Sequence, residues 1–220
     1  MQQKFHKTVA GLIHAGTLLS AGAGQHATNL GLVVGTKALV DADLNGLIDA
    51  TKAHLKGQSG LRALRQVLEV RAEEAYAVAH GIRDTLKRSL GRKYSKGWEG
   101  TGFRNGSLKV PRSVAALSDL LLSFKTYLAN HTNLEVPNVA TAVLAGNALT
   151  ALVAAETAVT AQVGVLRDAL AARRKASQKM HLRIRGVVEE LKRVIGPVDG
   201  RWEAFGLNQP GLKQAPKKPE

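Results

Sequence analysis

Apolar residues recur every three or four positions along most of the chain, which is the spacing of a helix with one buried face. The pattern is clearest between residues 61 and 90. There one continuous stripe is formed by Leu61, Leu64, Leu68, Ala72, Ala75, Ala79, Ile82, Leu86 and Leu90. Alternation with a period of two, which would indicate strands, is nearly absent. The sequence therefore predicts an all-α protein.

The helical pattern occurs twice. Residues 39–91 align without a gap with residues 144–196, at an offset of 105 and with about 12 identities in 53 positions. A self-match of this length indicates duplication of one supersecondary unit. The match extends in both directions, because Val9–Leu12 resembles Val114–Leu117 and Trp98–Phe103 resembles Trp202–Leu207. We expect one repeat unit at residues 1–112, a second at 113–213 and a polar tail at 214–220.

Each copy reads as three helices followed by a non-helical corner. The first helix is expected at residues 8–21 and 113–129, and the second begins near Thr36 and Asn138. The third carries the stripe described above, whose counterpart is Met180, Ile184, Val187, Leu191 and Val194.

Glycines mark the expected ends of these helices. Residues 57–60 (Gly-Gln-Ser-Gly) predict a break between the second and third helices of the first copy. Residues 162–165 are a much weaker break, so the same two helices can fuse in the second copy. Gly91 and Gly196 each occupy a C-cap position. The expected architecture has six main helices, arranged as two three-helix units that pack about a pseudo-two-fold axis and share one core.

The two corners carry the only tryptophans, at equivalent places after the third helix. A tryptophan at a turn either offers a platform on which a ligand stacks or fixes the turn against the helices. Large rings at turns usually do the second. We therefore interpret the corner residues as structural: Trp98, Gly102, Trp202 and Gly206.

The charge balance narrows the possible partners. The 220 residues include 31 Lys and Arg against 17 Asp and Glu, a net charge of +14, and contain no cysteine. The absence of cysteine excludes disulfides, thiolate nucleophiles and cysteine-based metal sites. The positive charge favours anionic partners, although a basic surface also occurs in proteins without such a function.

Basic residues concentrate on particular helices. Arg167, Arg174, His181, Arg185 and Lys192 can share one helical face, since they are spaced by seven, seven, four and seven. Arg88, Arg92 and Lys93 lie at the end of the third helix of the first copy. Such groups suit contacts to phosphates, and few aromatic residues are available to stack on single strands. If these residues bind nucleic acid, we therefore expect them to contact the backbone of a duplex. The structural alternative is that they form a solvated helix face.

Catalytic and metal-binding motifs do not appear. The seven histidines form neither His-Glu-x-x-His nor Glu-x-x-His, and the glycines around Ser107 do not match a phosphate-binding loop. Ser59 lacks the second glycine of a nucleophile elbow. We expect no enzyme activity, no metal and no cofactor.

Two apolar stretches invite a membrane interpretation. The first, residues 8–36, begins with a copy of an internal helix, which a cleaved leader should not do. The second, residues 139–165, is diluted by Asn147, Thr150, Glu156 and Thr160. We expect neither a signal peptide nor a membrane span, and the lack of cysteine slightly favours the cytoplasm.

The corner sequences GWEGTGFRNGSLKVP and RWEAFGLNQPG resemble those of a family of uncharacterised bacterial two-repeat helical proteins. That resemblance implies a helical architecture and a bacterial origin, and it brings no activity with it. The sequence as a whole predicts a non-enzymatic helical protein of structural or interaction type, whose partner is another protein or a second copy of itself. Binding of a duplex nucleic-acid backbone is the alternative.

Overall fold

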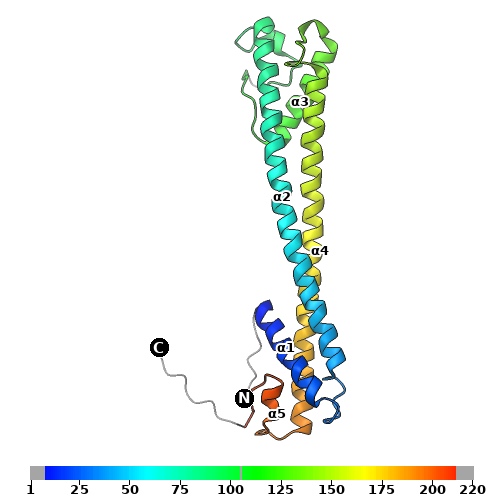
Figure 1. Ribbon diagram of the computed structural model, residues 1–220. Coiled ribbons are helices and arrows are strands. Elements are labelled where there is room, and N and C mark those ends of the chain that lie inside the picture. Colours follow the sequence, from blue (N-terminus) through cyan, green and yellow to red (C-terminus); the bar gives the residue numbers. More distant parts are fainter. Residues whose placement is uncertain (1–7, 105, 212–220) are drawn as a thin grey trace. The chain divides into compact units, whose positions relative to one another are not determined.

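The computed structural model describes residues 8–104 and 106–211, which form helices joined by short connections (Figure 1). The polar tail predicted at residues 214–220 lies outside the described residues. Within the described part, strand-like pairing is limited to one isolated bridge between Val136 and Ala140. The predicted all-α class is confirmed.

The helices repeat at the offset found in the sequence. Helix α1 spans Val9–His26 and α3 spans Val114–Asn130; α2 spans Lys37–Leu90 and α4 spans Ala142–Val194. The starts of both pairs are separated by 105 residues. Each corner is short and contains one turn of helix, the 3-10 helix η1 at Lys96–Trp98 or the α-helix α5 at Arg201–Ala204. A further 3-10 helix, η2, spans Thr132–Leu134.

The prediction of six main helices is wrong, because the expected second and third helices are continuous in both copies. The glycines at residues 57–60 do not break α2. They lie where α4 comes close: a Cβ added to Gly57 would be 3.3 Å from Leu166 Cδ1, and one added to Gly60 would be 3.1 Å from Gln162 Nε2. Glycine costs a helix interior about 1 kcal/mol, and here close packing compensates that cost.

The predicted helix ends are correct in one copy only. Gly91 has a φ of +91° directly after α2, as a C-cap glycine should. Gly196 does not adopt the left-handed conformation, because α4 ends earlier, at Val194. At the other end of the chain, the Thr8 side chain caps α1 by accepting a hydrogen bond from the Gly11 amide at 3.1 Å.

The compact units of the fold differ from the two copies of the repeat. Unit 1 consists of residues 1–57 and 166–220, and unit 2 consists of residues 58–165. Each unit therefore takes one half of α2 and one half of α4. The sequence placed the division after residue 112, because similarity identifies duplicated segments and does not reveal which segments pack together.

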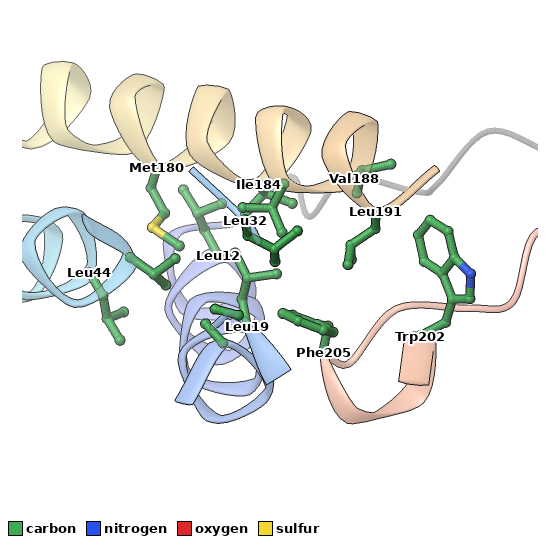
Figure 2. Close-up of a cluster of buried hydrophobic side chains, with 14 of the residues drawn as sticks. Leu12, Leu19, Leu32, Leu44, Met180, Ile184, Val188, Leu191, Trp202 and Phe205 are labelled. Atoms are coloured by element: carbon green, nitrogen blue, oxygen red, sulfur yellow. The ribbon is translucent and has the colours of Figure 1, made fainter. Parts of the chain in front are cut away.

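Unit 1 has a hydrophobic core to which both copies contribute equally (Figure 2). The first copy supplies α1 and the beginning of α2, and the second supplies the end of α4 and the corner around α5. In Figure 2 the side chains of Leu12 and Leu19 point toward Met180 and Leu191, with Phe205 beside them. Six of the labelled residues have counterparts in the core of unit 2: Leu12, Leu19, Met180, Ile184, Leu191 and Trp202 correspond to Leu117, Phe124, Ala75, Ala79, Leu86 and Trp98.

Unit 2 has its own core, built from equivalent positions. Leu117 replaces Leu12, Phe124 replaces Leu19 and Leu86 replaces Leu191, each shifted by 105 residues. Every buried residue of this core lies between Ala75 and Leu152, in one continuous segment of the chain. The expectation of a single shared core thus gives way to two cores, one in each unit.

The two corners make the same contacts. Trp98 and Trp202 are both 0% exposed. Their indole N–H groups donate to the carbonyls of Gly91 and Gly196, at 3.2 and 3.0 Å. A ligand platform needs an accessible ring face, which neither tryptophan offers, so each ring fastens its corner to the end of a long helix.

A glycine follows each tryptophan because the corner backbone comes close to a helix. Gly102 and Gly206 have φ angles of +94° and +69°. An added Cβ would lie 2.5 Å from Ser123 Cβ in α3 or from Leu18 Cβ in α1, and Ser123 and Leu18 are themselves equivalent. These two glycines are therefore required both by conformation and by contact.

The division into units predicts which fragments fold. Residues 58–165 contain the whole core of unit 2 and should melt cooperatively as a soluble fragment, followed by circular dichroism. Residues 1–112 lack the α4 side of unit 1 and the α3 side of unit 2, and should show no cooperative transition. The reverse outcome would contradict the assignment of the two cores.

Replacing Gly206 with alanine should lower the free energy of unfolding by about 3 kcal/mol, through strain and a clash with Leu18 Cβ. Gly31→Ala is the control, because Gly31 also has a positive φ (+64°) but no atom lies within 4 Å of an added Cβ. That change should cost only about 1 kcal/mol. Urea denaturation of both variants measures the difference, and equal losses would count against the contact.

Candidate binding surfaces

The half of α4 that belongs to unit 1 is strongly basic. Between Leu166 and Val188 it carries a single acidic residue, Asp168. Its basic residues are Arg167, Arg173, Arg174, Lys175, Lys179, Arg183 and Arg185. They divide between two sides of the helix, and the two sides differ in what they contact.

On one side, basic residues are neutralised by a buried carboxylate. The side chain of Asp43 in α2 is 1% exposed, and its oxygens lie 2.8 Å from Lys179 Nζ and 2.7 Å from Arg183 Nε. Burial alone would raise the pKa of Asp43, but the hydrogen bonds from Lys179 and Arg183 outweigh it, so the pKa lies below its usual value. This side of α4 is therefore structural.

The same side of α4 also holds the connection between α1 and α2. The Glu190 carboxylate accepts hydrogen bonds from the amides of Val33, Val34 and Gly35, at 2.9, 2.8 and 2.7 Å. Arg183 donates to the Val34 carbonyl at 3.0 Å. These bonds satisfy amides just before α2 that no helical carbonyl can reach.

The other side of the basic half lines a hollow, which we call the α4 hollow. Its volume is about 510 Å³. It is bounded by Val9 of α1 and by seven residues of α4: Arg173, Arg174, Ser177, Gln178, His181, Leu182 and Arg185. Arg174, Gln178, His181 and Arg185 follow one another at spacings of four, three and four, so they form one stripe along the helix.

The structure brings together only part of the predicted anion-contact set. Arg174 and Arg185 line the α4 hollow, with His181 between them. Arg167 and Lys192 are exposed on the same helix but outside the hollow, and Lys192 pairs with Glu189 at 2.8 Å. Arg88, Arg92 and Lys93 are exposed in unit 2. The sequence did not single out Ser177 and Gln178, although their spacing from Arg174 places them on its face.

The half of α4 that belongs to unit 2 is nearly uncharged. Residues 136–166 contain no Lys or Arg and one acidic residue, Glu156. One exposed face there, which we call the α4 seam, has six residues: Val143, Asn147, Thr150, Ala154, Thr157 and Ala161. Val143, Thr150 and Thr157 are seven residues apart, as are Asn147, Ala154 and Ala161, which is the period of a coiled-coil contact.

The polar atoms of the seam are largely satisfied within the helix. Thr150 donates to the Gly146 carbonyl at 2.9 Å, and Thr157 donates to the Val153 carbonyl at 2.8 Å. Their methyl groups remain available for contact. Val143 is 70% exposed, a high value for a valine.

By length and composition α4 is also the one described helix that could cross a membrane. Its most apolar 18-residue stretch has a mean hydropathy of 1.5, and 17% of that stretch is buried. A single helix of this kind is weak evidence for a membrane protein. What it does establish is a long apolar stretch whose outer faces are uncovered in this chain.

Among residues 8–104 and 106–211, no three His, Asp or Glu side chains gather as a metal site would require. Compared with protein-family models, with curated proteins and with solved structures, the chain matches none of them. The binding surfaces must therefore be interpreted from their own chemistry.

The low pKa of Asp43 predicts how unit 1 responds to pH. Because the folded pKa lies below the unfolded one, the stabilisation is fully present above about pH 4. It is lost as the pH falls through the folded pKa. Asp43→Asn should lower the free energy of unfolding at pH 7 by about 2–3 kcal/mol. The difference from the wild type should shrink as the pH falls below 4.

Asp49→Asn is the matched control, since Asp49 is exposed on the same helix. Urea denaturation of both variants between pH 3 and pH 7 provides the comparison. A pH-independent difference for Asp43→Asn would show that its charge is not what stabilises unit 1.

Proposed function

We propose that the chain is a non-enzymatic helical interaction protein that associates with a second copy of itself through the α4 seam. The observation that carries this proposal is a contrast between equivalent helix faces. The α2 positions equivalent to the seam are Ala38, Ala42, Asn45, Asp49, Lys52 and Lys56. They are exposed as well, but three of the six are charged. The second copy presents the same face without charge.

Charge explains why a second copy is the favoured occupant. Two chains of +14 repel each other, so they can associate closely only where basic residues are absent. Residues 136–166 belong to the longest part of the chain without Lys or Arg, residues 126–166. A partner surface must itself be uncharged, and an isologous dimer provides such a surface by symmetry.

The side chains of the seam suit close packing between helices. Alanine and threonine are small, and their spacing by seven keeps one face of the helix toward a partner over several turns. From Val143 to Ala161 the seam is about 27 Å long at 1.5 Å per residue. Within the chain, α2 and α4 already approach each other at small residues, as Gly57 against Leu166 illustrates.

A pseudo-two-fold relation between the two copies of the repeat accompanies this proposal. It is supported by the corner contacts that occur once in each unit, Trp98 with Gly91 and Trp202 with Gly196. An ancestral protein with one copy could have formed both cores as a dimer of identical chains.

Light scattering on a size-exclusion column should give a mass of about twice 23.4 kDa. Because the seam is uncharged, the association should persist at high salt, which also screens repulsion between the chains. Thr150→Lys should convert the protein to a monomer, since it places like charges opposite each other in the dimer.

Thr160→Lys is the matched control, with the same chemical change at an exposed position of the same helix. It lies about 80° around the helix from Thr150, and this variant should remain dimeric. A monomeric wild type, or equal behaviour of the two variants, would contradict the proposal. Lipid binding by the seam would also contradict the proposal. In that case the wild type would be a monomer that floats with neutral lipid vesicles, and the Thr150→Lys variant would not bind them.

A further inference from the structure

The α4 hollow in unit 1 has a composition that the seam proposal does not use. Three arginines and one histidine surround it, together with the hydroxyl of Ser177 and the amide of Gln178. None of the lining residues that the structure describes carries a carboxylate. A volume of about 510 Å³ is within the range of small-ligand sites.

The basic residues on the opposite side of α4 differ from those of the hollow, because they are paired with a carboxylate. Lys179 and Arg183 have the buried Asp43 as their partner. Arg174 has no acidic partner within the described part of the chain, and Arg173 donates to Nδ1 of His54 at 3.2 Å. Arg174 is therefore not neutralised by the carboxylate that pairs with Lys179 and Arg183 on the opposite side.

Unit 2 supplies an internal comparison, because two of the four residues equivalent to the stripe are acidic. Arg174, Gln178, His181 and Arg185 correspond to Glu69, Glu73, Tyr76 and His80. There Arg112 lies over the Tyr76 ring, 4.3 Å from its centroid, and pairs with Glu73 at 3.0 Å. The protein itself supplies a cation at the equivalent place in unit 2.

We propose that the α4 hollow binds a ligand with several adjacent phosphate groups. Arginine guanidinium groups bind phosphate oxygens in a bidentate manner, and serine and glutamine add neutral donors. Arg174 and Arg185 are about 16 Å apart along the helix axis, so the stripe can contact several phosphates at once. Among the described residues that line the hollow there is no tryptophan, tyrosine or phenylalanine, so recognition of a stacked base is not expected.

Two sources can present this chemistry, a free oligophosphate or the backbone of a nucleic-acid duplex. Titration calorimetry with inorganic tripolyphosphate measures the first, and fluorescence anisotropy with a short labelled DNA duplex measures the second, both at low salt. Binding of tripolyphosphate alone would identify a small-anion site. Duplex binding that requires the hollow would identify the backbone as its source of phosphates.

The decisive variant is Arg174→Glu/Arg185→Glu, which reverses the charge at both ends of the stripe. Glutamate is also the residue that unit 2 has at the position equivalent to Arg174, Glu69. This variant should weaken binding of whichever probe binds by at least tenfold. Arg62→Glu/Arg65→Glu is the matched control: it changes the net charge by the same amount at exposed positions of unit 2 and should alter affinity by less than twofold.

Equal losses in the two variants would overturn the proposal, because the net charge and not the hollow would then determine binding. So would the absence of binding by either probe. Arg174 and Arg185 are both exposed, and thermal melting of each variant verifies its fold. If Arg174→Glu/Arg185→Glu fails to fold, Arg174→Gln/Arg185→Gln removes the charges without reversing them, and the same tenfold loss is required.

Discussion

Neither copy of the repeat can cover its own apolar stripe, and the rest of the structure follows from this constraint. The core of unit 1 needs Leu12 and Leu19 from the first copy and Met180 and Leu191 from the second. The core of unit 2 has the complementary composition. Burial of apolar surface is the main favourable term in folding, and each copy buries its apolar residues by packing its halves against halves of the other. The long helices must therefore be continuous, since each contributes to both cores.

Duplication followed by divergence also explains where binding surfaces arise. Many positions that pack in the cores are apolar in both copies, as Leu12 and Leu117 are, whereas exposed positions differ between the copies. Asp49 and Lys52 face solvent in the first copy where Ala154 and Thr157 do so in the second. Arg174 has the opposite charge to its counterpart Glu69. One helix, α4, thus carries an uncharged face in unit 2 and a basic hollow in unit 1.

Several features of the fold could be predicted because they depend on local chemistry. The period of the apolar stripe defined the helices, and the offset of 105 identified equivalent positions before any contact was known. The sequence placed Gly102 and Gly206 in the corners that carry the tryptophans, and the structure adds that their positive φ and close helix contacts recur. The prediction of a helix break at residues 57–60 was wrong because glycine has two uses in helices. It ends helices, and it also lets two helices approach each other closely. Only the neighbouring Leu166 and Gln162 distinguish these roles.

By itself, the sequence determined the helical class, the duplication and the separation of basic from uncharged segments, because each is a property of residue order and type. Tertiary structure decided which halves of the two copies pack together. Sequence similarity between the copies is the same whether each copy folds by itself or packs its halves against halves of the other copy. Tertiary structure also decided that Lys179 and Arg183 are neutralised by Asp43 while Arg174 and Arg185 line a hollow. All four are basic residues of one helix, and only their distances to groups remote in the chain separate a structural ion pair from a candidate binding site.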